Sequence, residues 1–307
     1  MDDSDAPFFP PELEREIFET AAVLYPQTIG SLLYVSKRVH DWIERILYRT
    51  ITPYGARSTC STRVLLDAIQ SNLKPESFFR DRVLHLHLNA FSNSALPDVP
   101  KLLSMCPEVR DLRITIDAHQ IQLDQILPGL AALRLRRLGA FLKLVLPSSI
   151  PGPVLAAVTH LNIFDSFPTH DQLTNWLVLF PVLTHVAVRH NSVPLARNVL
   201  AVCKNLQVLV FLHLGRSMGG KRENIPSAED DRFVRMLTHF GWSEEDWITG
   251  SNGGMDFWTS AEIFIAKKRR GEIVPDSRCW IEKKDGIGYE YFADNPPSEF
   301  SPVIPSP

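Results

Sequence analysis

The sequence predicts an α/β protein with three parts: an N-terminal segment of three helices, an α/β solenoid with parallel strands, and a C-terminal helical cap. Two observations support this order. Apolar residues recur with helical spacing over about the first 50 positions. After them, short segments with apolar residues at alternate positions return every 23 to 26 residues, with helical stretches between them.

The composition is that of an ordinary globular chain. Of its 307 residues, 45% are hydrophobic and 22% are charged, and the formal net charge is −3. This slightly negative charge gives no electrostatic basis for binding nucleic acid or an anionic membrane. No apolar run approaches the ~18 residues of a membrane span, and the first residues lack the pattern of a signal peptide. We therefore expect an intracellular protein, cytoplasmic or nuclear.

The cysteines do not form a recognisable ligand or disulfide pattern. Cys60, Cys106, Cys203 and Cys279 are at least 46 residues apart, without a CxxC pair or a cysteine–histidine spacing. We expect neither a disulfide framework nor a metal or other cofactor. Cys106 and Cys203 end apolar helical segments, where a thiol packs as a small hydrophobe.

The first predicted helix has an apolar stripe formed by Leu13, Ile17, Ala21 and Leu24. Consecutive prolines open it, because proline suits the first turn of a helix. The Tyr25-Pro26 pair ends it, because a residue before proline avoids the α conformation. We predict that this helix contributes half to a core and half to a surface that binds another protein.

Two further helices follow within the next 25 or so residues. Thr28 is suited to cap the second. The third, over 36–51, has one broad apolar face that consists of Val39, Trp42, Ile43, Ile46 and Leu47. Three short helices form too small a bundle to bury all of this surface. Part of it must contact either the following domain or a partner.

The stretches FPPELEREIFETAA and TIGSLLYVSKRVHDWIERILYRTI together resemble an F-box, in its Pro-x-Glu-Leu start, Ile-Phe helix, Leu-Leu pair and Trp-containing helix. The version here is similar to the divergent F-box-like proteins of mushroom-forming fungi, and it covers residues 8–51. F-boxes bind the Skp-type adaptor of cullin–RING ubiquitin ligases. The resemblance therefore implies adaptor contacts by Pro11, Leu13, Ile17, Leu32, Leu33, Val35 and Trp42. The alternative is a helical cap that only covers the end of the next domain.

Residues 52–226 contain the repeats. One apolar position returns as Leu86, Leu112, Leu138, Leu161, Val186 and Leu209, and a second, two residues later, as Leu88, Ile114, Ala140, Ile163, Val188 and Phe211. Alternation predicts a short strand in each unit. The repeat length fits the leucine-rich-repeat range of about 20–29, and a stack of such units aligns its strands in parallel. A degenerate leucine-rich-repeat-like solenoid is the prediction, and an ordinary α/β sandwich is the alternative.

The residues between the two columns should point to the opposite, concave face of the strands. This face has polar side chains in the early repeats, and we expect a protein substrate to bind to His85, His87, Asp111, Arg113, His160, Asn162, His185 and Arg189. Its histidines are also compatible with plain surface positions or, less readily, with a metal site. At the last repeat the face becomes apolar, with Val208, Val210 and Leu212, so a C-terminal segment should cover it.

The cap is assigned to residues 227–274. Helices are predicted over 227–241, where Phe233, Leu237 and Phe240 share a face, and again over about 259–273. Lys267 to Arg270 suit the last turn of the second helix, although four basic residues also fit a nuclear-import signal. Residues 275–307 should be largely irregular, and disordered from about 295.

No nucleophile-elbow, zinc-protease, dinucleotide-binding or phosphate-loop motif is present. Together with the F-box resemblance, the absence of these motifs predicts a non-enzymatic adaptor. Its N-terminal helices would bind a Skp-type adaptor and, through it, a cullin–RING ligase, and the concave face would bind an unknown protein substrate. The alternative is a leucine-rich-repeat-like interaction scaffold that recruits no ligase.

Overall fold

The structure, a computed structural model, describes residues 9–53, 60–72, 74–89, 99–115, 123–145, 155–166, 169–189, 192–214, 229–238 and 242–287. The fold is α/β, with a nine-stranded parallel sheet in the strand order β2-β1-β3-β4-β5-β6-β7-β8-β9. The chain divides into two compact units. Unit 1 comprises residues 1–164, 178–182 and 251–253, and unit 2 comprises 165–177, 183–250 and 254–307. The predicted disordered tail from about 295 lies outside the described residues.

The N-terminal helices of unit 1 form where the sequence predicts them, except that the third ends at Leu47 instead of continuing to residue 51, because residues 50–52 form a strand. They are α1 (Pro11–Leu24), the 3₁₀ turn η1 (Pro26–Thr28), α2 (Ile29–Leu32) and α3 (Lys37–Leu47). Pro11 opens α1, and the Ser36 hydroxyl caps α3 by accepting a hydrogen bond from the Val39 amide at 3.3 Å. Thr28 does not cap α2, because its hydroxyl donates to the Tyr25 carbonyl instead.

Two strands and two helices that the sequence did not predict connect this bundle to the repeats. They are β1 (Thr50–Thr52), β2 (Cys60–Ser61), α4 (Thr62–Gln70) and α5 (Glu76–Arg82). Both strands are too short to give an alternating pattern of useful length. A salt bridge of 2.7 Å from Lys74 Nζ to Glu44 Oε2 ties the segment before α5 to α3.

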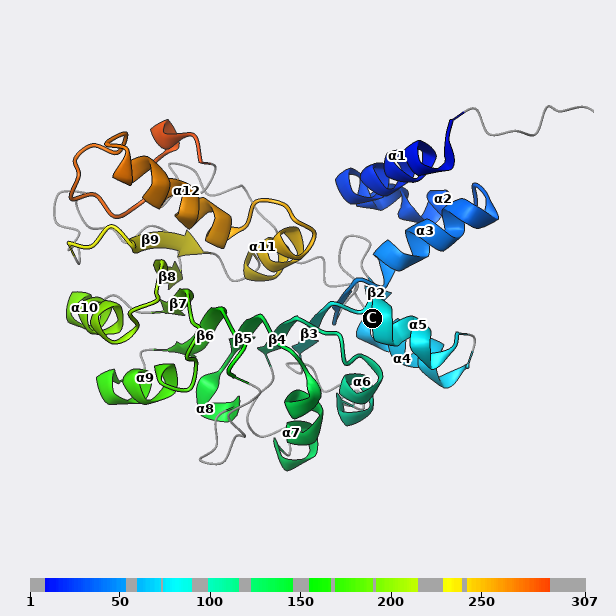
Figure 1. The fold of residues 1–307 in the computed structure, drawn as a ribbon, viewed down its shortest axis with the longest axis horizontal. Helices are drawn as coiled ribbons and strands as arrows, with labels where there is room; N and C mark the ends of the chain where they lie inside the picture. Colours follow the sequence, from blue (N-terminus) through cyan, green and yellow to red (C-terminus); the bar gives the residue numbers. More distant parts are fainter. Residues whose placement is uncertain are drawn as a thin grey trace, which may run out of the picture. The chain divides into compact units, whose positions relative to one another are not determined.

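The repeats of unit 1 alternate strand and helix (Figure 1). The order is β3 (His85–Asn89), α6 (Val99–Met105), β4 (Asp111–Thr115), α7 (Leu123–Ala132), β5 (Arg137–Ala140), α8 (Leu142–Val145) and β6 (His160–Ser166), which ends in unit 2. The predicted columns are confirmed by the register, which pairs Leu86 with Leu112, Leu112 with Leu138, and Leu138 with Leu161. These leucines are at most 3% exposed, so the column is a buried core.

Unit 2 continues with α9 (His170–Leu177), β7 (His185–Arg189), α10 (Val193–Val202), β8 (Val208–Leu214) and β9 (Phe233–Thr238). Val186 pairs with Leu209 and Leu209 with Phe233, so the predicted column extends by one strand that the sequence analysis did not assign.

The helix predicted over 227–241 is wrong, because residues 233–238 form β9. Pairing with β8 outweighs the local helical spacing. Val234 and Met236 point to one face of the strand and are buried in the core there.

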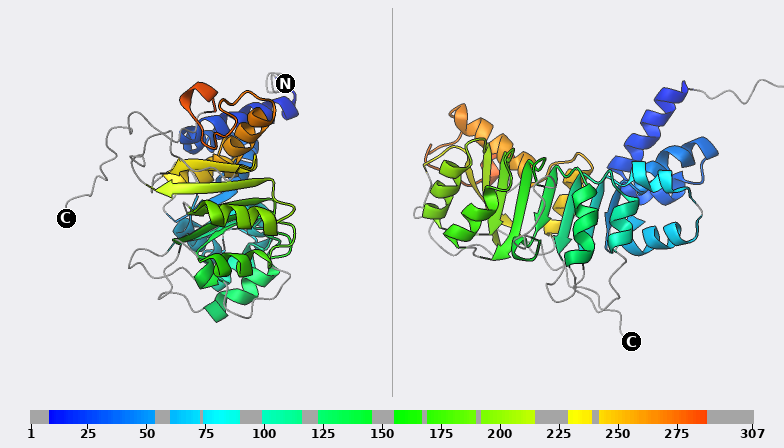
Figure 2. Two further views of the ribbon diagram at one scale, coloured as in Figure 1. Left: turned by 90° about the vertical axis from the view of Figure 1, so that its left-hand side faces the viewer. Right: turned by 60° about the horizontal axis from the view of Figure 1, so that its bottom comes forward.

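The helices α11 (Trp242–Ser251) and α12 (Phe257–Arg269) follow β9, and the 3₁₀ turn η5 (Lys283–Asp285) is the last element that the structure describes. Asp256 caps α12 by accepting a hydrogen bond from the Thr259 amide at 2.8 Å. Phe264 and Ala261 of α12 pack with Val208, Val210 and Leu212 in one hydrophobic cluster. The prediction that a C-terminal segment covers this apolar strand face is therefore confirmed. Figure 2 shows α12 and α10 on opposite sides of these strands.

The basic last turn of α12 and the burial of two cysteines agree with the local sequence. Lys267, Lys268 and Arg269 lie in the last turn of α12, and Gly271 follows with φ of +74°. Lys268 is only 5% exposed and pairs with Asp231 at 3.4 Å.

Cys106 is fully buried, and burial raises the pKa of its thiol to about 12. Cys203 is half-buried, and burial raises its pKa as well.

Candidate functional site

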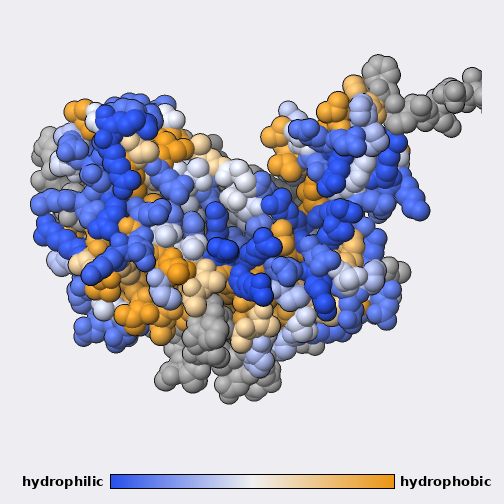
Figure 3. All heavy atoms as spheres, viewed as in Figure 1, coloured by the Kyte–Doolittle hydropathy of each residue, from blue (hydrophilic) through white to orange (hydrophobic). Residues whose placement is uncertain are grey.

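The predicted adaptor-binding residues on α1 lie on the outer face of this helix. Leu13 is 49% exposed and Ile17 is 52% exposed, while the side of α1 that faces the bundle presents Phe18 and Ala22. The apolar stripe predicted from the sequence therefore lies on the exposed side of the helix and not on the side that packs into the bundle core. Figure 3 shows hydrophobic side chains at the surface formed by α1.

The remaining adaptor-binding candidates divide between surface and core. Pro11 and Val35 are exposed, and Val35 reaches 54%. Leu32, Leu33 and Trp42 are half-buried and pack against the bundle core of Ala22, Ile29, Val39 and Ile43. We call the exposed residues Pro11, Leu13, Ile17 and Val35 the outer apolar surface.

An exposed aromatic residue that sequence periodicity does not predict lies next to this surface. Tyr34 is 91% exposed and directly precedes Val35. A tyrosine in that environment supplies a large contact area with little conformational freedom to lose on binding. Its position in the turn between α2 and α3, where no periodic pattern exists, is why sequence periodicity could not find it.

Polar contacts hold the bundle that carries the outer apolar surface. Arg38 Nη2 of α3 donates to Glu14 Oε1 of α1 at 2.8 Å. The His40 ring, through Nδ1, lies 3.0 Å from the Leu33 carbonyl and joins α3 to the end of α2. These contacts fix the three helices relative to one another, so the apolar residues are presented by a preorganised frame.

The predicted substrate-binding residues of unit 1 lie on neighbouring strands and contact one another. His85 Nδ1 is 3.8 Å from Asp111 Oδ2, and His87 Nε2 is 2.8 Å from Thr115 Oγ1. The Arg113 guanidinium lies 4.9 Å from the centre of the Phe164 ring. His87, Asp111 and Arg113 are buried, so these three form an internal polar layer.

Other residues of the predicted substrate-binding row remain partly exposed to solvent. His85, His160 and Asn162 are half-buried in unit 1. The His160 ring is oriented by the Thr159 hydroxyl, at 2.9 Å from Nδ1. The structure therefore places a smaller set of polar atoms at the surface of these strands than the sequence predicted.

In unit 2, α12 covers part of the predicted row. His185 is 4% exposed, with Nε2 at 2.9 Å from Glu262 Oε1 and Nδ1 at 2.8 Å from the Thr184 hydroxyl. Its ring also meets the Trp258 ring edge-to-face at 5.7 Å. Arg189 is half-buried, and burial lowers the pKa of its guanidinium. His185 thus joins α12 to β7.

The described residues provide no group of three or more histidine, cysteine or acidic side chains placed to hold a metal ion. Within the same residues, no helix has both the length and the apolar character needed to cross a membrane. The features that the structure does bring together are an exposed apolar surface on helices and a polar strand face.

No protein-family model matches the chain, and no curated protein matches it significantly.

Proposed function

We propose that this protein is a non-catalytic substrate adaptor that resembles the F-box subunits of cullin–RING ubiquitin ligases. Its N-terminal helices would dock a Skp-type adaptor through the outer apolar surface. The observation that carries the proposal is the exposure of Leu13, Ile17 and Val35, at 49, 52 and 54%. Apolar side chains left exposed on one helical bundle are a feature of protein-binding sites.

The docking part of the proposal rests on two supports. The first is the resemblance of residues 8–51 to an F-box. The second is that Phe18 and Ala22 are the α1 side chains that pack into the bundle core, whereas Leu13 and Ile17 remain exposed. Burying such side chains against a partner stabilises a complex by roughly 25 cal/mol for each Å² of apolar surface, and this gain is absent while they face water.

We further propose that the strand–helix repeats are a degenerate leucine-rich-repeat-like solenoid that binds a protein substrate. The support is the constant register of the leucine column in unit 1 and its counterpart in unit 2. The half-buried polar residues of the row are the best candidates for substrate contact, namely His85, His160 and Asn162 within unit 1 and, separately, Arg189 within unit 2.

In this proposal the chain acts by positioning rather than by chemistry. Two binding modules on one protein raise the concentration of the substrate near an active site on another chain. Ubiquitin transfer would therefore occur on other subunits. The place of action would be the cytoplasm or the nucleus, where these ligases operate.

The experiment that tests the docking proposal is co-purification with a Skp-type adaptor. Leu13→Asp combined with Ile17→Asp should abolish co-purification and leave the far-ultraviolet circular dichroism spectrum unchanged, because both side chains are outside the core. Val64→Asp combined with Val178→Asp is the matched control, since these residues are 51 and 66% exposed outside the outer apolar surface. The control variant should still bind.

Retained binding by the Leu13 and Ile17 variant would overturn the docking proposal. Failure of the wild-type chain to bind any Skp-type adaptor would instead favour the alternative function. In that case the N-terminal helices only cap the repeats, and the protein is an interaction scaffold that recruits no ligase.

A further inference from the structure

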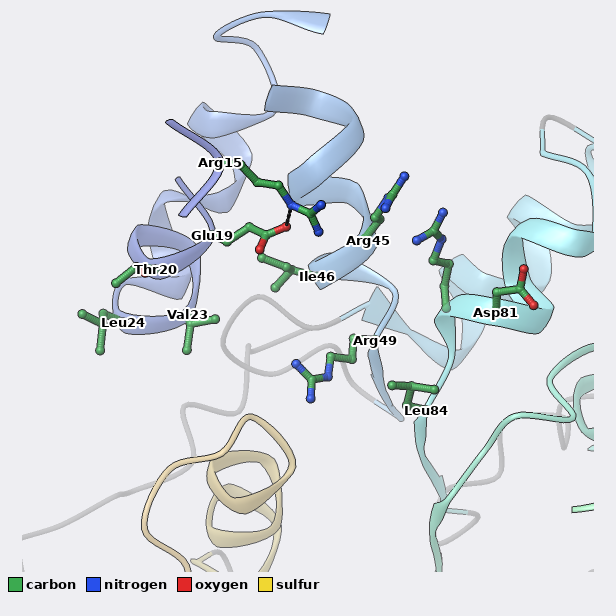
Figure 4. Close-up of a pocket in the computed structure, with 11 residues that line it drawn as sticks. Arg15, Glu19, Thr20, Val23, Leu24, Arg45, Ile46, Arg49, Asp81 and Leu84 are labelled. Atoms are coloured by element: carbon green, nitrogen blue, oxygen red, sulfur yellow. Dashed lines mark hydrogen bonds and ion pairs between the residues drawn. The ribbon is translucent and has the colours of Figure 1, made fainter. Parts of the chain in front are cut away.

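An open groove with a cavity volume of 560 Å³ lies on unit 1, beside but distinct from the outer apolar surface. Its walls come from four segments that are far apart in the sequence (Figure 4). They are α1, the end of α3 together with Arg49, the end of α5, and Leu84 just before β3. The lining residues are Arg15, Glu19, Thr20, Val23, Leu24, Arg45, Ile46, Arg49, Asp81, Arg82 and Leu84.

The groove gathers four arginines in a chain whose formal net charge is −3. Arg15 is neutralised within α1, because its Nε donates to Glu19 Oε1 at 2.7 Å. Arg45, Arg49 and Arg82 form no ion pair with any residue that the structure describes. Asp81 is the other carboxylate of the lining. Three guanidinium groups therefore line one groove, and Asp81 is the lining carboxylate that remains to balance their positive charge.

Arg82 is the most buried of these three side chains, because Arg45 and Arg49 are exposed. The pKa of Arg82 is lowered by burial first and then by repulsion from Arg45, with Asp81 and Glu44 opposing the effect. Its Nε is buried and has no hydrogen-bond partner among the described residues. The guanidinium carbon lies 5.7 Å from the centre of the Phe78 ring, which helps to hold the planar group in place.

The rest of the lining is apolar. Val23 and Leu24 are 40 and 64% exposed on α1, and Ile46 and Leu84 are half-buried opposite them. An inorganic ion alone would leave these side chains unused. A peptide would use both features, because an anionic side chain pairs with the planar arginine forks while its apolar neighbours contact the walls.

We propose that this groove binds an anionic peptide segment of a protein partner, in which a phosphorylated or acidic side chain is flanked by apolar residues. Arg45 and Arg82 bind the anionic group, and Val23 and Leu24 contact the flanking residues. Recognition of phosphorylated and acidic motifs by clustered arginines is a recurring mode of peptide binding. This inference does not depend on whether α1 docks a Skp-type adaptor.

The test is a fluorescence-anisotropy titration of the full chain with an array of labelled peptides. The peptides have leucine-rich flanks and, at the centre, phosphoserine, phosphothreonine, a pair of aspartates, or unmodified serine. We expect at least one anionic series to bind about tenfold or more tightly than the serine series, and to weaken as salt is added. The comparison of phosphorylated and aspartate peptides identifies the source of the charge.

Two double variants that each remove two positive charges make the test specific. Arg45→Gln with Arg82→Gln should weaken binding of the anionic peptides about tenfold or more. Arg63→Gln with Arg80→Gln changes exposed arginines outside the groove and should leave affinity within about twofold of wild type. If the first variant fails to fold, Arg49→Gln alone, on an exposed residue of the lining, should still weaken binding.

Three results would overturn the inference. The first is that no anionic peptide binds better than the serine peptides. The second is that both double variants weaken binding equally, which would indicate attraction by charge in general. The third is that a single-stranded oligonucleotide binds more tightly than any peptide with the same dependence on Arg45 and Arg82, which would indicate a nucleic-acid site.

Discussion

At the scale of single residues, Gly139 shows how closely the polar strand face of unit 1 is packed. A Cβ atom at this position would lie 2.9 Å from Cζ of Phe164. The Phe164 ring is buried, meets Phe141 edge-to-face at 5.7 Å, and lies under the Arg113 guanidinium. The ring therefore has little freedom to move, and only glycine fits on β5 without displacing it.

We expect Gly139→Ala to lower the free energy of unfolding by about 1–3 kcal/mol, because overpacking forces neighbouring side chains out of their preferred positions. Gly30→Ala is the matched control, because nothing lies within 4 Å of the added atom in α2. That change should raise stability by roughly 0.5–1 kcal/mol through helix propensity. Urea unfolding checks both values, and a neutral Gly139→Ala would contradict the close packing of Phe164.

A second residue-scale feature is the ion pair of Arg278 and Asp285 in unit 2. The two guanidinium nitrogens donate to the two carboxylate oxygens at 2.7 Å, and the side chains are 1 and 3% exposed. Burial opposes ionisation of Asp285, but the hydrogen bonds from Arg278 and the Glu282 amide outweigh it and hold the pKa of Asp285 below its usual value.

Asp285→Asn should therefore cost up to about 3 kcal/mol of stability near neutral pH, because it leaves the buried Arg278 with only the more distant Glu282 carboxylate, 3.4 Å from Nη1, as a counter-charge. Because the folded-state pKa of Asp285 is depressed, its contribution is complete above the unfolded pKa of about 4 and is lost as pH falls through the folded value. The gap between wild type and variant should consequently close at acidic pH in urea unfolding. A gap that persists unchanged to low pH would contradict the assignment. The control, Glu272→Gln in the exposed pair with Arg270, should leave the midpoint unchanged.

At the scale of elements, α12 acts as the cover of an apolar strand face. Phe264 is fully buried in the cluster that includes Val208 and Val210 of β8. We expect Phe264→Ala to destabilise the protein by about 3–5 kcal/mol through the cavity it leaves. The same change should speed amide hydrogen exchange in β8, since that strand loses part of its cover.

The control for this prediction is Met255→Ala, which changes a residue that is 49% exposed just before α12. It should shift stability by no more than about 0.5 kcal/mol. If Phe264→Ala were as mild as the control, α12 would not be the cover that the packing indicates.

The elements also explain which parts of the fold the sequence could predict. The strands were predictable because a buried column returns at regular intervals, as Leu86, Leu112 and Leu161 do. β9 was missed because Phe233 and Leu237 also satisfy helical spacing, and only the partner strand β8 decides between the two. α1 was predicted correctly, but its apolar stripe faces outward, since bundle packing uses Phe18 and Ala22.

The candidate sites were predictable to a smaller degree, for a related reason. A row of residues at a fixed place in each repeat can be read from periodicity, but its burial cannot, because it depends on what covers the strands. His185 is covered by α12, whose Glu262 lies 77 residues later in the chain. The arginine groove has no sequence signal at all, because Arg15, Arg45 and Arg82 come together only through the packing of α1, α3 and α5.

At the scale of the whole molecule, we propose binding surfaces rather than a catalytic centre for the chain. The outer apolar surface and the arginine groove both lie on unit 1, and each uses side chains that the core leaves exposed. In unit 2, by contrast, α12 packs against the apolar face of the strands. We therefore propose that partners bind mainly through unit 1.

The most direct measurement is calorimetric titration of a purified Skp-type adaptor into the purified full chain at several temperatures. The account predicts one-to-one binding with a negative heat-capacity change, because apolar surface is buried when Leu13 and Ile17 are covered. It predicts no binding heat for Leu13→Asp with Ile17→Asp. A wild-type chain that gives no heat at any temperature, or a variant that binds as tightly as wild type, would contradict it.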